Sequence, residues 1–188
     1  MLAAIEERKP SLLYLAYPNN PTANLWDDAV IDRLIAAVGH HHGLVVMDEA
    51  YQPFAARDSM SRLQRFPHLM VMRTMSKFGL AGVRLGYLAG AAALIEQIEK
   101  VMPPYNVSAL NAEATLFALD HADVFDEQAT VLRAERSRLA AVLAGLPGVT
   151  VFPSDANMLL IRVPDSTRAF EGLTSRGVLV KHIAGLHP

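Results

Sequence analysis

Residues Leu44-Val-Val-Met-Asp-Glu-Ala-Tyr51 join an unbroken apolar run to a short polar string. The run Leu44-Val-Val-Met47 has the composition of a buried strand, and similar runs occur at Leu12-Leu-Tyr-Leu-Ala16 and Leu69-Met-Val-Met72. Apolar residues with a helical period over residues 25–41 separate the first two runs. Strand, helix and strand in alternation, with apolar strands, predict an α/β fold with a mainly parallel sheet.

The remaining pattern predicts two domains. The further expected elements are helices over residues 2–8, 94–101, 109–146 and 166–176, and strands over residues 85–89, 149–152, 157–163 and 178–180. Pro103-Pro104 is the strongest hinge signal, because two prolines stop a helix. We therefore expect residues 1–104 to be the C-terminal part of a large α/β domain. Residues 105–188 are expected to form an incomplete, smaller α+β domain that begins with a long helix.

The composition limits the classes of function. Of the 188 residues 52% are hydrophobic, which is enough for a buried core. A formal net charge of -2, without a long run of one sign, argues against binding to nucleic acid or to an anionic membrane. The chain has no cysteine for a disulfide framework, and residues 1–10 lack the apolar core of a signal peptide. We expect a cytoplasmic protein.

Lys77 is the strongest candidate for a catalytic residue. It lies in Ser76-Lys-Phe-Gly-Leu-Ala-Gly-Val-Arg84, shortly after an apolar run, where a strand end would open into a cleft. A lysine in such a place can be a Schiff-base nucleophile. Asp48 ends another apolar run, and a buried carboxylate needs a positive partner. That partner could be the pyridinium nitrogen of a cofactor, or Asp48 could instead cap a helix or form a salt bridge.

Four more residues complete a candidate cofactor site. Asn20 and Tyr51 could donate hydrogen bonds to a phenolate oxygen, although Asn20 also suits the turn before Pro21 and Tyr51 could be a core residue. Ser76 and Arg84 could hold a phosphate, because a guanidinium fork matches phosphate oxygens and a hydroxyl adds a donor. The alternative for Arg84 is a surface ion pair. Together these groups are what pyridoxal 5'-phosphate (PLP) requires.

Other polar clusters have ordinary explanations. His40-His41-His42 does not indicate a metal site, because adjacent histidines do not face a common point, and no metal is expected. Arg133, Arg136 and Arg138 recur with a helical period, and we predict that they form a solvated face of the long helix.

Three motifs carry a resemblance to a known superfamily. Asn19-Asn-Pro-Thr22, Asp48-Glu-Ala-Tyr51 and Ser76-Lys-Phe-Gly-Leu-Ala-Gly-Val-Arg84, in this order and at these separations, resemble fold type I PLP-dependent aminotransferases of class I and II. The resemblance spans nearly the whole chain. It implies part of a PLP-transferase large domain, a mainly parallel sheet flanked by helices, followed by part of a small C-terminal α+β domain.

Within that superfamily the chain is most similar to the histidinol-phosphate aminotransferase family. This similarity rests on Asp48-Glu-Ala-Tyr-Gln-Pro-Phe54, Ser154-Asp-Ala-Asn-Met158 and Gly177-Val-Leu-Val-Lys181. It implies reversible amino transfer between histidinol phosphate, or a related amino donor, and 2-oxoglutarate in histidine biosynthesis. It also implies a homodimer with sites at the subunit interface.

The resemblance gives every candidate residue a role around one cofactor: Lys77 as the covalent attachment point and proton carrier, Asp48 at the pyridinium nitrogen, Asn20 and Tyr51 at the phenolate oxygen, Ser76 and Arg84 at the phosphate, and Asn157 near the substrate. Members of the family are considerably longer, so the chain is expected to be truncated at both ends. It also has Ala23 after Thr22, where the family commonly has glycine.

Two other functions stay open. A PLP-dependent lyase or decarboxylase that acts on a phosphorylated amino acid would resemble the family in the same motifs. A non-catalytic remnant would also keep these motifs, because truncation can remove activity while Lys77, Asp48 and Arg84 remain in place.

Overall fold

The computed structural model describes residues 1–183; residues 184–188, the end of the predicted second domain, lie outside it. The helices are α1 (Leu2–Arg8), α2 (Asp28–His40), α3 (Met75–Phe78), α4 (Ala92–Glu99), α5 (Ala109–Asp120), α6 (Ala122–Ala144) and α7 (Ser166–Thr174). The strands are β1 (Leu12–Ala16), β2 (Leu44–Asp48), β3 (Leu69–Thr74), β4 (Gly86–Gly90), β5 (Thr150–Val151) and β6 (Ile161–Arg162). Three 3-10 helices are η1 (Gln52–Phe54), η2 (Met60–Gln64) and η3 (Ala81–Val83). No helix in this part of the chain combines the length and apolar character that crossing a bilayer needs.

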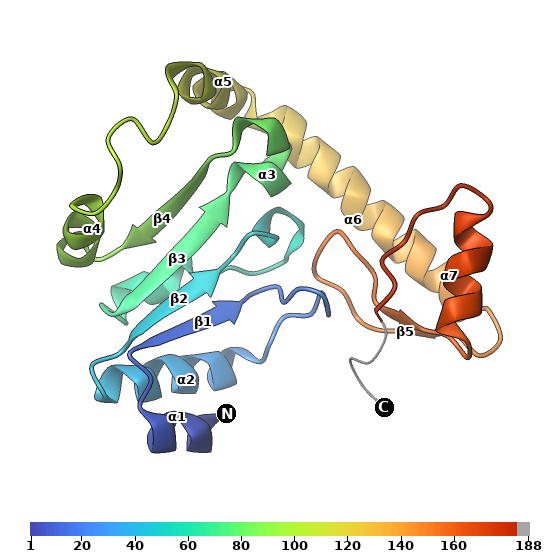
Figure 1. Ribbon diagram of the computed structural model, residues 1–188, viewed down its shortest axis with the longest axis horizontal. Helices are drawn as coiled ribbons and strands as arrows, with labels where there is room; N and C mark the ends of the chain where they lie inside the picture. Colours follow the sequence, from blue (N-terminus) through green and yellow to red (C-terminus); the bar gives the residue numbers. More distant parts are fainter. Residues whose placement is uncertain (184–188) are drawn as a thin grey trace.

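Four strands form the main sheet, in the order β1-β2-β3-β4 (Figure 1). β1, β2 and β3 are parallel, with Ala16 opposite Asp48 and Asp48 opposite Met72, whereas β4 runs antiparallel to β3. The predicted α/β fold with a mainly parallel sheet is therefore confirmed. Because the parallel strands point the same way, the polar segments that follow them leave the sheet at one common edge.

Helix α2 packs its apolar side against the sheet. The buried cluster that α2 forms with α1 and the strands contains Ile5, Leu15, Ile31, Leu34, Ile35, Val38, Val45, Met47, Leu69 and Val71. The helix begins later than residue 25, because Asp27 is its N-cap and its carboxylate accepts a hydrogen bond from Val30 N at 3.0 Å. The predicted start was wrong for this reason.

Strand β1 is less buried than the prediction of a buried strand required. Leu12 and Tyr14 are 46% and 62% exposed, whereas Leu13 and Leu15 pack on or in the core cluster. Successive side chains of a strand point to opposite faces, and β1 is an edge strand with only one face toward the core cluster.

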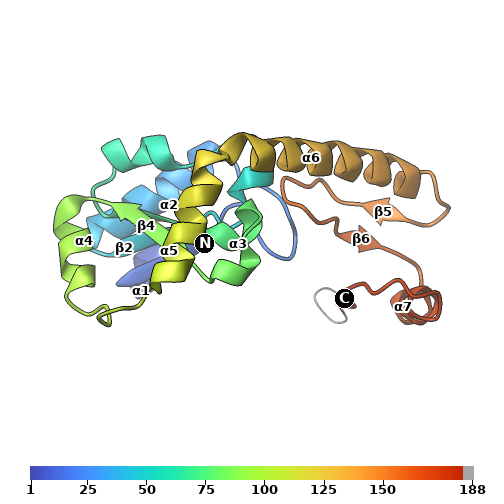
Figure 2. The ribbon, with the colours of Figure 1, turned by 90° about the horizontal axis from the view of Figure 1, so that it is seen from above.

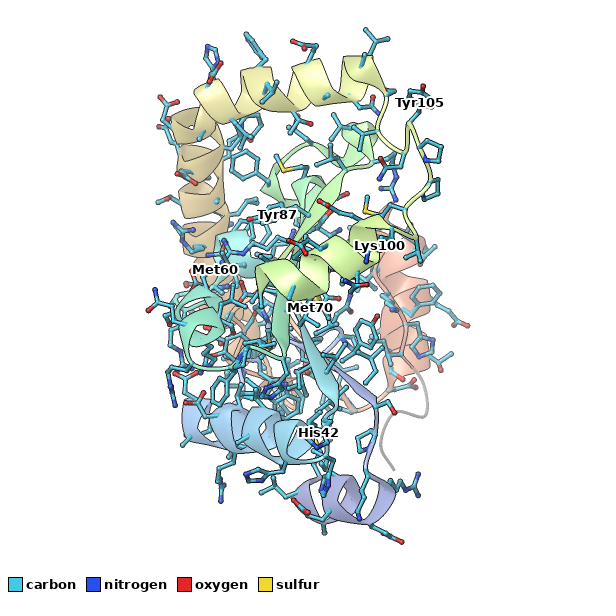
Figure 3. The ribbon with its side chains drawn as sticks, turned by 90° about the vertical axis from the view of Figure 1, so that its left-hand side faces the viewer. His42, Met60, Met70, Tyr87, Lys100 and Tyr105 are labelled. Atoms are coloured by element: carbon cyan, nitrogen blue, oxygen red, sulfur yellow. The ribbon has the colours of Figure 1, made fainter. Side chains whose placement is uncertain are left out.

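Residues 109–146 form two helices instead of the predicted long one. His121, with φ -119° and ψ 35°, separates α5 from α6. α6 then extends from the main sheet toward the antiparallel pair β5-β6 and helix α7 (Figure 2). Figure 3 shows Tyr105 on the irregular segment between α4 and α5, close to the predicted hinge.

The predicted strand over residues 178–180 is wrong, because these residues are irregular. The backbone N–H of Val178 donates to Leu173 O at 3.0 Å and so completes the end of α7. Apolar composition alone does not make a strand, which also needs a hydrogen-bonded neighbour.

Candidate active site

Asp48 lies at the carboxyl end of the inner strand β2. Its carbonyl accepts a hydrogen bond from Tyr17 N at 2.8 Å, and Glu49 N donates to Met72 O at 2.8 Å, so the chain is bonded to both neighbouring strands where it leaves the sheet. The side-chain Oδ1 accepts from Ala50 N at 3.0 Å. This is an Asx turn, which fixes the carboxylate at the start of the following loop.

Lys77 lies on α3, the short helix that follows β3. Thr74 caps this helix, because its hydroxyl oxygen accepts a hydrogen bond from the backbone two residues on at 3.1 Å. At the other end Gly79 has φ 133°, and a Cβ there would lie 2.6 Å from the Phe125 ring of α6. Phe78 packs on the same ring, with centroids 4.9 Å apart. Both ends of the lysine-bearing helix are therefore held in place.

Asn20, Tyr51 and Lys77 come together from three separate segments. Asn20 Nδ2 donates a hydrogen bond to the Tyr51 hydroxyl at 3.1 Å, and Lys77 Nζ lies 5.3 Å from the centroid of the Tyr51 ring. An ammonium at this distance is attracted by the ring face. The tyrosine hydroxyl accepts from Asn20 and keeps its own hydrogen for a further partner.

Asp48, Ser76 and Arg84 line one open hollow of about 700 Å³. Arg84 Nη1 lies 3.5 Å from Ser76 Oγ, at the long end of hydrogen-bond range, and 3.4 Å from Ala81 O. Arg84 takes no part in the ion pairs found among residues 1–183, so the surface ion pair considered for it is not observed there. Its φ of 50° lies in the left-handed region, which is uncommon for a residue with a side chain.

Asn157 is exposed and is not among the residues that line this hollow. Its loop is nevertheless tied to the segment of Asn20, because Asp155 N donates to Ala23 O at 2.7 Å. Ala23 is buried and has φ 63°, the left-handed conformation that glycine adopts without strain. The glycine preference of the resembling family at this position thus has a physical reason, and the turn still forms with alanine.

The sequence did not reveal how Glu49 supports this site. Its carboxylate is buried and accepts hydrogen bonds from Arg73 Nε and Nη2, at 2.9 and 2.8 Å, and from Ser59 N. Burial raises the pKa of Glu49, and the hydrogen bonds and charge of Arg73 only partly oppose this. The acid beside Asp48 in sequence could be noticed, but its partner Arg73 lies on another strand.

The prediction that Arg133 and Arg136 belong to a solvated helix face is wrong. Both donate hydrogen bonds to backbone carbonyls of segments far away in the sequence, whereas Arg138 is exposed and pairs with Glu135 at 2.7 Å. Carbonyls at turns need donors, and the periodicity of a helix does not show where those carbonyls lie.

Comparison with known proteins identifies the class of protein. The family model of aminotransferase class I and II matches residues 1–187, and the chain belongs to this family. The histidinol-phosphate aminotransferase of Methylibium petroleiphilum is 65% identical over 188 residues, which are 100% of this chain and 51% of that protein. The chain therefore spans about half the length of the curated relatives it matches.

Solved structures share the fold. The histidinol-phosphate aminotransferase from Sinorhizobium meliloti in complex with pyridoxal-5'-phosphate gives a TM-score of 0.82 at 27% identity and covers 98% of this chain and 53% of its own. A decarboxylase from Sulfurospirillum multivorans gives a TM-score of 0.85 at 24% identity, with coverages of 98% and 56%. At that identity the second similarity shows the fold alone.

Proposed function

We propose that this chain carries the cofactor-binding residues of a PLP-dependent aminotransferase whose substrates are histidinol phosphate, or a related amino donor, and 2-oxoglutarate. The observation that carries the proposal is the meeting of Asn20, Tyr51 and Lys77 at the same sheet edge from which Asp48 leaves β2. The name of the relative at 65% identity supports the choice of amino donor over the lyase or decarboxylase alternative.

The residues present fit PLP by their chemistry. When bound, this cofactor supplies an electron sink for the carbon that exchanges its amino group. Asp48 would accept a hydrogen bond from the ring nitrogen and keep it protonated. Tyr51 would donate its remaining hydrogen to the ring oxygen, with Asn20 fixing the orientation of that hydroxyl. Ser76 and Arg84, which line the same hollow as Asp48, would hold the phosphate.

Lys77 would be both the covalent attachment point of the cofactor and the group that moves the proton. Its Nζ is close to the Tyr51 ring, and α3 is held by its N-cap and by the Gly79 turn. A lysine amine that is released after attachment can take a proton on Nζ and return it at a neighbouring carbon, which is general acid–base catalysis by one residue.

The proposal has four further parts, which concern the substrate contact, the domain boundary, the location in the cell and the oligomeric state. We place Asn157 near the substrate, because its loop is bonded to the segment of Asn20. We propose a domain boundary near residue 104, where the chain is irregular between α4 and α5. The protein would act in the cytoplasm as a homodimer with sites at the subunit interface.

The test is covalent trapping of the cofactor on the purified chain. PLP is titrated while absorbance is recorded, the complex is reduced with borohydride, and labelled peptides are mapped. The chain has lysines only at Lys9, Lys77, Lys100 and Lys181, so peptide mapping distinguishes label on Lys77 from label on the other three or on the N-terminal amine of Met1. We expect label on Lys77, loss of the absorbance band in Lys77→Ala, and an unchanged band in Lys100→Ala, whose lysine is exposed on the end of α4 (Figure 3).

Label spread evenly over the lysines, or a band that survives in Lys77→Ala, would contradict the assignment of Lys77. The substrate is tested separately by following conversion of the bound cofactor after histidinol phosphate is added, with aspartate as the comparison donor. Conversion by aspartate but not by histidinol phosphate would contradict the proposed donor and leave the PLP site intact.

A further inference from the structure

Two arginines of α6 bind the turn that follows Tyr51. Arg133 Nη1 donates to Pro53 O at 2.8 Å, and Arg136 Nη1 donates to Phe54 O at 3.3 Å. Pro53 and Phe54 are the last residues of η1, and the final carbonyls of a helix have no partner within it. The guanidinium groups satisfy these carbonyls with charge-assisted hydrogen bonds, which is favourable at a helix C-terminus.

Arg136 also reaches a second segment. Its Nη1 donates to Ala156 O at 2.7 Å, in the loop that carries Asn157. Ala156 is 0% exposed, and its carbonyl has a second, longer hydrogen bond from Ser154 Oγ at 3.3 Å, so Arg136 is the closer of two donors to a buried oxygen. One guanidinium nitrogen therefore joins α6, the turn after Tyr51 and the loop of Asn157. Arg133 binds only the first of these two segments.

We propose that Arg136 is a positioning residue that sets the distance between the Tyr51 turn and the Asn157 loop, and so holds the second part of the chain against the cofactor site. The role of the cofactor site rests on the function proposed above. The hydrogen bonds by which Arg136 joins the two segments are observed in the structure and do not depend on that function. Arg136 is not placed among the groups that touch the cofactor.

The geometry separates this role from general stabilisation of α6. Arg138 is on the same helix but is exposed and pairs with Glu135, one turn away, so it joins no separate segments. Arg136→Met keeps most of the length of the side chain and removes every donor. Arg136→Lys keeps one charged donor group, which can serve one carbonyl well but lacks the fixed fork of arginine.

The absence of cysteine from the chain makes a distance measurement clean. Ala56→Cys and Pro153→Cys place spin labels at exposed positions, one after the turn and one before the loop. Pulsed electron resonance on the full chain then gives the distribution of distances between the two segments. We expect Arg136→Met to broaden or shift this distribution, Arg136→Lys to do so less, and Arg138→Met to leave it unchanged.

An unchanged distribution in a folded Arg136→Met chain would overturn the inference, as would an equal change in Arg138→Met. If Arg136→Met lacks the helical circular dichroism of the parent, Arg136→Lys decides, and an unchanged distribution in that variant would overturn it as well. In the PLP titration we expect Arg136→Met to bind more weakly than the parent, because the Tyr51 turn is then held less firmly, and Arg138→Met to bind as the parent does. A parent chain that binds no PLP would refute the proposed function, while the distances would still decide the role of Arg136.

Discussion

Arg73 and Glu49 form an ion pair in which Nη2 and Oε2 are 2.8 Å apart, and the Glu49 side chain is completely buried. Arg73 lies on β3, and Glu49 directly follows Asp48 at the end of β2. The pair therefore bonds the start of the Asp48 loop to the strand that leads to Lys77. Ser59 N donates to the same carboxylate from the far side of that loop.

We expect Arg73→Met to lower the free energy of unfolding by about 3 kcal/mol, because it leaves a buried carboxylate without its partner. Burial already raises the pKa of Glu49 above its usual 4.5, and removal of Arg73 would raise it further. A carboxyl with a raised folded-state pKa loses stability as the pH rises through that value. The deficit in urea unfolding should therefore be larger at neutral pH than at mildly acidic pH.

Arg138→Met is the matched control, since it removes an exposed arginine from a surface pair and should change unfolding little. A deficit for Arg73→Met that is the same at both pH values would show that lost packing, not the charge of Glu49, dominates. Addition of Glu49→Gln to Arg73→Met should then leave the loss of unfolding free energy unchanged, because the charge of Glu49 would not contribute to it.

Asp32 should contribute to acid unfolding. Partial burial raises its pKa, but hydrogen bonds and charges from Arg62 and Arg65 outweigh this and hold the pKa below the usual 3.8. A carboxyl with a lowered folded-state pKa stabilises the fold above its unfolded value, and this contribution is lost as the pH falls through the folded value. Asp32→Asn should therefore be less stable than the parent at neutral pH, and the difference should shrink below about pH 4.

The measurement is the denaturant midpoint as a function of pH. Asp120→Asn, at an exposed aspartate at the end of α5, serves as the control. A difference between Asp32→Asn and the parent that stays constant down to the lowest pH would show that the negative charge of Asp32 does not contribute to stability.

The sequence predicted the parts of the fold that depend on local pattern. The apolar runs before Asp48 and Lys77 are strands, and the polar residues after them do lie at one sheet edge, because parallel strands must point the same way. The antiparallel direction of β4 was not predicted, since it depends on η3 turning the chain back beside β3. Local periodicity carries no information about such pairings.

Long-range partners account for the residues that the sequence missed. Arg136 recurs with the other arginines at a helical period, which is the pattern of a solvated helix face. Its acceptors are the backbone carbonyls of Phe54 and Ala156, and a pattern of side chains does not show where such carbonyls lie. In the sequence Arg73 is only a polar residue near the end of a strand, and the structure shows that it pairs with Glu49. The candidate cofactor residues were recognised through motifs, whereas the residues that hold them in place needed the structure.

Gly79→Ala should displace the helix that carries Lys77. At φ 133° a residue with a Cβ is strained by about 1–3 kcal/mol, and the new methyl group would meet the Phe125 ring. We expect a loss of about 2 kcal/mol in unfolding free energy, together with weaker PLP binding. Gly82→Ala is the control, because a Cβ there meets nothing within 4 Å. Equal behaviour of the two variants would show that the Gly79 turn does not constrain α3.

Tyr51→Phe tests the hydroxyl without disturbing the ring. The ring would still face Lys77 Nζ, but Asn20 Nδ2 would lose its acceptor, and the ring oxygen of the cofactor would lose a donor. We expect PLP affinity to fall about tenfold, as for one lost hydrogen bond to a charged oxygen, with little change in unfolding. Tyr105→Phe, at a tyrosine that is 98% exposed, should match the parent.

Asn20→Ala and the double variant complete this test as a thermodynamic cycle. If Asn20 acts by orienting the Tyr51 hydroxyl, its removal should cost much less affinity in the Tyr51→Phe background than in the parent, because the oriented group is already gone. Additive losses would mean that the two residues contact the cofactor independently. The hydrogen bond of 3.1 Å between them favours coupling, since one hydroxyl that accepts from Asn20 has its single hydrogen left to donate elsewhere.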